Sequence, residues 1–420
     1  MRIHVHVACF TSLLLFSYKA FPQFNVAAEL RPRTEFRNGF KRPLAPQESP
    51  AFFTEQRSRL YLAYKKDQFE LLLAPQYIHM WGNNDQASKT DRGLANLQQA
   101  WMAYTFNAQH RIAGGRMELN YDNARILGNL DWAQQGRSHD VLKYEYAAQG
   151  LRIHGAVAFN QDTNVPEPGK LAETTYAPQL NNYKALQFLW FNKVVQKTSL
   201  SALLLNESRQ YAADTVYYKQ TGGIYGTFKL MPVILTAEYY HQRGRDRLGN
   251  GVRAHLASLN ASTALGPAFR LELGGDYLTG DNSNTAANEA FDPLYGTHHQ
   301  FYGLMDYFYV GNGHGNLGLN DLYTKAKYEE GHHRVQVDVH RFASTAALVD
   351  GANDFTRGSL FGWEFDVVYA YQLAAACRLQ VGYSYMRCAD ALRAAKGIAD
   401  GKNASWGWLM VAYKPILFEN

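Results

Sequence analysis

Arginine and acidic residues stand at alternating positions early in the sequence. The arginines are Arg31, Arg33, Arg57, Arg59 and Arg116, followed by Arg125, and the acidic residues near them are Glu29, Glu35, Glu55 and Glu118. Side chains two residues apart on a strand point to the same face. A guanidinium binds a carboxylate through two hydrogen bonds, so surplus arginines on a wet face would select anions such as carboxylated sugars. Cross-strand ion pairs that brace the wall are an alternative that stays open.

Several patterns typical of enzymes fail on geometry. Residues 138–140 read Ser-His-Asp, but neighbours on an extended chain point in opposite directions and form no triad. Glycines at residues 313–318 match a dinucleotide-binding spacing without a βαβ unit around them. The histidine pairs at 298–299 and 332–333 lack a spaced third ligand, and we interpret them as surface or girdle histidines. We expect no catalytic residue, no metal, no cofactor and no nucleic-acid binding.

The elements that would position the charged residues are strands. Segments with strand character recur along the chain, and no stripe of helical period is as strong. Their expected ranges are 24–37, 53–65, 69–81, 96–106, 109–121, 139–147, 150–160, 182–195, 198–207, 215–229, 232–242, 252–262, 267–278, 318–328, 332–343, 361–373, 377–387 and 406–418. They number 18. An even number is typical of single-chain bacterial barrels.

The joins between these segments alternate between short and long. Short joins lie at 66–68, 107–108, 196–197 and 330–331, and long ones at 38–52, 82–95, 122–138, 161–181, 279–317, 344–360 and 388–405. Outer-membrane barrels have brief periplasmic turns and long outer loops. We therefore expect both termini on the periplasmic side, and gating by long outer loops such as residues 279–317. A large soluble all-β protein gives no reason for this alternation.

Three segments separate charged from apolar side chains by parity. In 24–37, apolar residues alternate with Glu and Arg. In 334–340, three valines alternate with Arg, Gln, Asp and His. In 363–371, aromatic residues and Val367 share one parity, and Glu364 and Asp366 the other. A charged face cannot meet lipid, so we expect the charges in a water-filled lumen and the apolar face on the membrane.

The first residues and the aromatic content point to the same class. Residues 1–23 have a signal peptide's features, with Arg2 ahead of an apolar stretch at 9–16. We expect its removal, which leaves residues 24–420 as one barrel domain in the bacterial outer membrane. No later apolar run reaches the roughly 18 residues that a spanning helix needs, and a closed barrel is the other fold that satisfies every backbone polar group in a bilayer. The 28 tyrosines and 23 phenylalanines suit aromatic girdles.

Two stretches resemble a known family. Residues 114–140, GGRMELNYDNARILGNLDWAQQGRSHD, resemble the signature of the alginate export family of outer-membrane barrels, because Gly115-Arg116, Arg125 with Gly128, and Trp132 recur in order. Residues 291–321 resemble its Bacteroidetes-type branch. The resemblance implies an 18-stranded monomeric barrel whose basic lumen passes an anionic uronic-acid polymer. It also implies that Arg116 and Arg125 line the pore.

Together these observations predict a transmembrane antiparallel β-barrel that acts as a passive channel for anionic saccharides. The expected pore-lining residues are Arg31, Arg33, Arg57, Arg59, Arg116, Glu118 and Arg125. The expected partners are an anionic oligo- or polysaccharide and outer-membrane lipid. The alternatives are a nutrient-uptake porin for other small solutes and, further away, a barrel lipase or protease.

Overall fold

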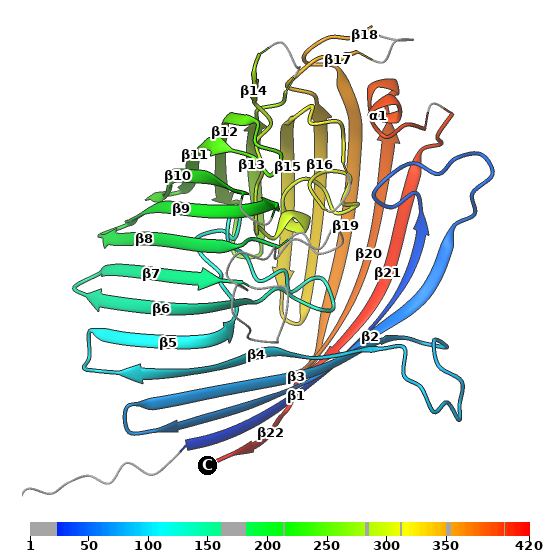
Figure 1. The fold of residues 1–420 in the computed structure, drawn as a ribbon. Helices are drawn as coiled ribbons and strands as arrows, with labels where there is room; N and C mark the ends of the chain where they lie inside the picture. The colour runs from blue at the N-terminus through cyan, green and yellow to red at the C-terminus, as the bar shows by residue number, and fades with distance from the viewer. Residues whose placement is uncertain are drawn as a thin grey trace, which may run out of the picture.

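The fold is a closed antiparallel barrel of 18 strands with a filled interior (Figure 1). The computed structural model describes residues 23–160, 182–212, 215–281, 285–310, 313–349, 354–398 and 400–420. Residues 1–22, and with them nearly all of the expected signal peptide, lie outside the described residues. The barrel strands are β1 (Gln23–Asn38), β2 (Ala51–Lys66), β3 (Phe69–Met80), β4 (Leu94–Thr105), β5 (His110–Met117), β6 (His139–Ala148), β7 (Leu151–Phe159), β8 (Ala185–Val195), β9 (Thr198–Ala212), β10 (Thr215–Leu230), β11 (Val233–Arg245), β12 (Gly251–Ala264), β13 (Phe269–Leu278), β15 (Leu319–Glu330), β16 (His333–Ala343), β19 (Leu360–Ala374), β20 (Cys377–Cys388) and β21 (Ala404–Tyr413).

The first and last strands close the barrel. β1 pairs with β2 on one side, and on the other with β21 and its continuation β22 (Ile416–Glu419). Each barrel strand is antiparallel to the next along the chain, so no sheet edge meets lipid. The predicted barrel of 18 strands is confirmed. Three expected segments differ noticeably: 109–121 ends as a strand at Met117, 198–207 extends to Ala212, and 406–418 divides between β21 and β22.

The predicted parity of the strands is also confirmed. On β1, Arg31 and Glu35 are buried, whereas Leu30 is 44% exposed. On β16, Val337 is exposed and Asp338 is buried. The buried charged face lines the lumen, and the exposed apolar face forms the membrane surface.

The joins follow the predicted alternation except at two places on the outer side. β9 and β10 are separated by residues 213–214 alone, and β11 and β12 by residues 246–250. The longer outer joins carry β14 (Ala287–Asn288), the hairpin of β17 (Leu348–Val349) and β18 (Asp354–Phe355), the 3₁₀ turn η2 (His298–Gln300) and α1 (Asp390–Ala395). No described helix is long and apolar enough to cross a membrane.

The hydrophobic core lies inside the barrel. Two outer segments fold into the lumen: residues 118–138, here the first inward loop, and residues 289–318, the second inward loop, of which 311–312 lie outside the described part. They bury apolar side chains that include Leu119, Leu127, Phe291, Met305 and Phe308. The loop from 279 to 317 was expected on the outer side, and its described part from 289 onward instead packs against the inner wall.

Candidate functional site in the lumen

The two inward loops are hydrogen-bonded to each other. The Gly128 N–H donates to the Tyr295 carbonyl at 2.9 Å, and the Tyr295 N–H donates to the Ile126 carbonyl at 3.1 Å. The Thr297 N–H donates to the Ala124 carbonyl at 2.8 Å. A Cβ on Gly128 would lie 2.4 Å from the Thr297 hydroxyl, so only glycine allows this approach. The loops therefore form one body that narrows the lumen.

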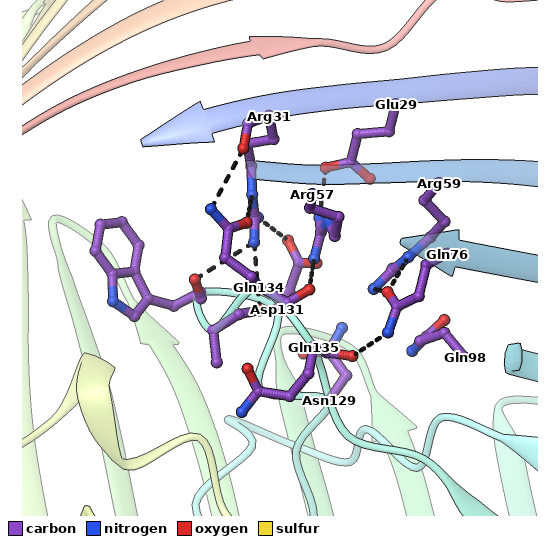
Figure 2. A network of polar contacts seen from close by, with 12 residues as sticks. Glu29, Arg31, Arg57, Arg59, Gln76, Gln98, Asn129, Asp131, Gln134 and Gln135 are labelled. Atoms are coloured by element: carbon purple, nitrogen blue, oxygen red, sulfur yellow. Dashed lines mark hydrogen bonds and ion pairs between the residues drawn. The ribbon is translucent and has the colours of Figure 1, made fainter. Parts of the chain in front are cut away.

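Arginines of β1 and β2 hold the first inward loop (Figure 2). Arg31 donates to the Gln134 side chain at 3.0 Å and lies 3.5 Å from the Asp131 carboxylate. Arg57 lies 3.0 Å from Asp131 and also contacts Glu29. Partial desolvation alone would raise the pKa of Asp131, whose side chain is half exposed, but the guanidinium groups of Arg57 and Arg31 hold this pKa below its ordinary value. These two arginines are buried and bonded to the loop, so they fit the bracing interpretation better than a free cationic ladder.

Arg33 and Arg59 make similar connections. Arg33 donates to the Trp132 carbonyl at 2.7 Å and lies over the Trp132 ring at 4.3 Å. Arg59 donates to the Gln76 side chain at 2.6 and 2.9 Å, and Gln76 donates to the Gln135 carbonyl at 3.0 Å. The structure thus brings Arg31, Arg33, Arg57 and Arg59 to one patch of the inner wall. That patch is covered by the loop.

Glu118 and Arg125 of the first inward loop also lie inside. Glu118 accepts hydrogen bonds from Gln98 at 2.7 Å and Asn129 at 3.0 Å. Arg125 is 2% exposed; it forms two bonds to Asp276, at 2.9 and 3.1 Å, and one to Glu238 at 2.6 Å. Its guanidinium also lies over the Phe301 ring at 4.0 Å. Arg125 therefore ties the first inward loop to β11 and β13.

Arg116 does not fit a pore-lining role. On β5 it has the opposite parity to Ala113 and Met117, which are buried towards the lumen. It forms an ion pair at 3.0 Å with its cross-strand partner Asp140, and both side chains are substantially exposed. The arginine of β5 that faces inward is Arg111, which pairs with Glu70 and Glu145. Strand alternation allows Arg111 or Arg116 inside, not both.

Acidic side chains line the inner wall from β11 to β19. They are Glu238 of β11, Asp276 of β13, Asp321 of β15, Asp338 of β16, and Glu364 and Asp366 of β19, all buried. Glu364 accepts a hydrogen bond from the Met305 N–H at 2.8 Å and so holds the second inward loop. His340 contacts Asp321 at 2.9 Å. The lumen therefore carries both signs of charge, with arginines gathered on β1 and β2 and acidic side chains on β11 to β19.

A cavity of about 640 Å³ lies beside the inward loops. Its cationic lining residues are Arg137, Arg209, Lys219, Arg245 and Arg247, and its acidic ones are Glu207, Asp246 and Asp292. Lys219 lies 2.7 Å from Asp292 and 3.0 Å from Glu207, and Arg209 lies 3.2 Å from Glu207. Cations thus outnumber carboxylates among the described lining residues.

Arg137 differs from Arg209 and Lys219, which form ion pairs in this cavity. It donates to the Gly296 carbonyl at 2.8 Å and forms no ion pair with a carboxylate in the described residues. Burial lowers its pKa to about 10. A partly buried guanidinium without a counter-charge loses some of its hydration, and a ligand carboxylate would offset that loss. Arg137 was not among the residues predicted from the sequence, although it lies within residues 114–140.

The histidines and the Ser-His-Asp run are placed by the same loops. His299 is buried, contacts Asp306 at 2.7 Å and stacks on Trp132 at 4.5 Å, so the expectation of surface or girdle histidines at 298–299 is wrong. His332, in the turn before β16, and His333, the first residue of β16, are exposed, as expected. His139 faces inward against Tyr183, whereas Asp140 points outward to Arg116. The described residues contain no cluster that could hold a metal ion.

Comparison with solved structures shows the same fold in bacterial porins. The crystal structure of OccK9 (OpdG) from Pseudomonas aeruginosa matches with a TM-score of 0.64 at 15% identity, over 94% of this chain and 98% of that one. A BenF-like porin from Pseudomonas fluorescens Pf-5 matches with a TM-score of 0.65 at 12% identity, over 94% and 99%. OpdK from Pseudomonas aeruginosa, solved with vanillate, matches with a TM-score of 0.61 at 11% identity, over 93% and 98%.

Comparison by sequence gives no match. No protein-family profile and no curated protein matches the chain. The resemblance to the alginate export family is therefore not supported, and the likeness to porins is one of fold. That fold, with its apolar outer face, agrees with the outer-membrane location expected from the sequence.

Proposed function

We propose that this protein is a passive outer-membrane channel for small solutes, with small carboxylates as the preferred class. The observation that carries the proposal is the cavity beside the inward loops, where Arg137 is partly buried and forms no ion pair with a carboxylate among the described residues. A planar guanidinium pairs with a carboxylate through two hydrogen bonds. One fold neighbour was solved with vanillate, itself a small aromatic carboxylate.

The small-solute alternative is supported better than passage of a polymer. The inward loops are tied to each other and to four strands of the wall, through Arg31, Arg57 and Arg125. A polymer would have to pass a lumen narrowed by both loops. A small solute needs only the cavity and the space beside it.

Bilayer recordings test the proposal. Purified protein is inserted into planar bilayers, and the reversal potential is measured in a KCl gradient. We expect the wild type to prefer anions and Arg137→Gln to lower the ratio of anion to cation permeability. The matched control is Arg92→Gln, which removes a charge from the exposed join between β3 and β4.

Added solutes separate the solute classes. Galacturonate should reduce the single-channel current of the wild type more than neutral galactose does, and this difference should shrink in Arg137→Gln. An unchanged reversal potential and unchanged block in correctly assembled Arg137→Gln would reject a carboxylate site here. Stronger block by long oligouronates than by the monomer would favour the polymer channel instead.

A further inference from the structure

The lipid-facing side of β11 and β12 carries a cationic band, formed by Arg243, Arg253, His241 and His255, between its apolar belt and the outer ends of the strands. Outward residues of β11 run from Val233, Leu235 and Ala237 through Tyr239 and His241 to Arg243. This order goes from apolar to aromatic to cationic towards the outer end of the strand. In barrels, the aromatic girdle lies at the membrane interface, so Arg243 lies at the level of lipid headgroups.

The cross-strand register places like charges opposite each other in this band. Arg243 is the direct partner of Arg253 on β12, and His241 is the direct partner of His255. Like charges directly opposite each other destabilise a sheet. In the described part of the chain, neither arginine forms an ion pair with a carboxylate. A bound external anion would therefore reduce the repulsion between Arg243 and Arg253.

The band borders a polar cavity under the outer loops. This cavity, of about 600 Å³, is lined by Arg253, His255, Tyr277 and Arg357 among others, with Glu289 as the single carboxylate among its described lining residues. Tyr277 stacks on His255 and accepts a hydrogen bond from Arg357. Phosphate groups suit such a site, because basic pockets at membrane interfaces bind anionic lipid headgroups.

An apolar groove continues from the cavity along the outer wall. The groove, of about 740 Å³, shares His241 with the polar cavity and includes Arg243 at its upper end. Its outward apolar residues include Leu142, Val157, Leu189 and Leu204, and Gly155 and Gly222 leave gaps between them. A groove of this kind accommodates an acyl chain, whereas free phosphate has no apolar part that could occupy it.

We propose that this outer face binds a phosphorylated glycolipid of the outer leaflet, with its phosphate between Arg243 and Arg253 and an acyl chain in the groove. The site lies on the lipid side of the wall, apart from the lumen. It is therefore independent of the solute that the channel passes.

Native mass spectrometry with purified protein in a neutral detergent tests this site. The probe is hexa-acylated lipid A with both phosphates. We expect the double variant Arg243→Gln/Arg253→Gln to weaken binding about thirtyfold, because each arginine near a headgroup contributes roughly one kcal/mol. The matched control, Arg270→Gln/Arg378→Gln, removes two exposed arginines at the periplasmic end and should bind like the wild type. Heat-modifiability gels verify that each variant is a folded barrel.

A second variant and two further probes make the test specific. Gly222→Leu fills the groove without changing charge and should also weaken binding, since a Cβ there already approaches Leu204 at 3.4 Å. Dephosphorylated lipid A should bind less well than lipid A, and millimolar inorganic phosphate should not displace the lipid. Equal binding by the double variant, or by the dephosphorylated lipid, would overturn the proposal. Displacement by phosphate alone would make this an anion site without a lipid.

Discussion

Arg125 shows how a residue expected to line a pore fixes a loop instead. Its guanidinium is surrounded by Glu238, Asp276, Tyr302 and Phe301, and its own loop has no other ion pair to that part of the wall among the described contacts. Removing one partner of a buried ion network leaves the others uncompensated. The Arg125 guanidinium, which could bind an anion, is already paired with the carboxylates of Glu238 and Asp276.

The first prediction concerns this network. Arg125→Gln should destabilise the protein by about 3 to 5 kcal/mol, since it leaves Glu238 and Asp276 buried without a cation. Denaturant unfolding in micelles measures the loss, and single-channel recordings should show noisier currents as the first inward loop loses its anchor. The control is Arg42→Gln, in which an exposed pair with Glu48 is lost with little effect on stability, because solvent screens such a pair. Equal losses in the two variants would refute the anchoring role.

The second prediction concerns pH. The Asp292 side chain is half exposed, and partial desolvation works against its carboxylate, but the Lys219 ammonium and the Leu294 N–H outweigh this effect and lower its pKa to about 2. An ordinary aspartate has a pKa of about 3.9, so the ionised form stabilises the folded loop above that pH, and this contribution is lost as the pH falls towards 2.

Current noise recorded between pH 5 and pH 2 should show this loss. This range covers the pKa of a free aspartate, which is roughly 3.9. We expect noise from the second inward loop to rise on acidification in the wild type. Asp292→Asn should be noisy at all pH values and show no such step. A step of the same size in the variant would assign it to another group.

At the scale of the strand, the two faces of β16 make the third prediction. Val337→Arg places a charge at mid-membrane depth on the lipid side and should cost roughly 2 to 4 kcal/mol. Gln336→Arg places the same charge in the lumen beside Asp338, whose carboxylate Gln336 already contacts at 2.7 Å, and should be tolerated. Unfolding free energies in lipid vesicles measure both. Equal damage would contradict the assigned parity.

Strands could be predicted from the sequence because their signal is local. In β1, Glu29, Arg31 and Leu30 reveal both faces within three residues, and the short turns set the ends. The same alternation could have corrected the prediction that Arg116 lines the pore, because Arg111 points to the opposite face of β5. The family resemblance, not the pattern, placed Arg116 in the pore.

The inward loops could not be predicted because their contacts are distant in sequence. Arg31 meets Gln134 across 103 positions, and Arg125 meets Asp276 across 151. Long polar joins with buried aromatics, such as Trp132 and Tyr302, resemble outer loops as much as lumen plugs. Arg137 was missed for the same reason, because its isolation from carboxylates depends on how the loop folds.

At the scale of the whole molecule, the outer rim is uneven. The joins after β9 and β11 are short, while the joins that follow β5 and β13 turn into the lumen. Residues 246–250 thus form a short exposed turn at the rim, next to the cavity lined by Arg245 and Asp246. This turn gives a compact test of the orientation of the barrel.

The last prediction places that turn outside the cell. An epitope inserted between Leu248 and Gly249 should be reached by antibody on intact cells, because exposed turns tolerate insertion and long loops mark the outer side. The matched insertion lies between Asp67 and Gln68, in the turn joining β2 to β3 at the opposite end, and should be labelled only after the outer membrane is permeabilised. Heat-modifiability of both proteins excludes misfolding as the cause of any missing antibody label. Since adjacent strands are antiparallel throughout, one orientation fixes every other turn. Labelling of the second site alone on intact cells would show that the barrel has the opposite orientation. The cationic band would then lie in the inner leaflet instead of the outer leaflet.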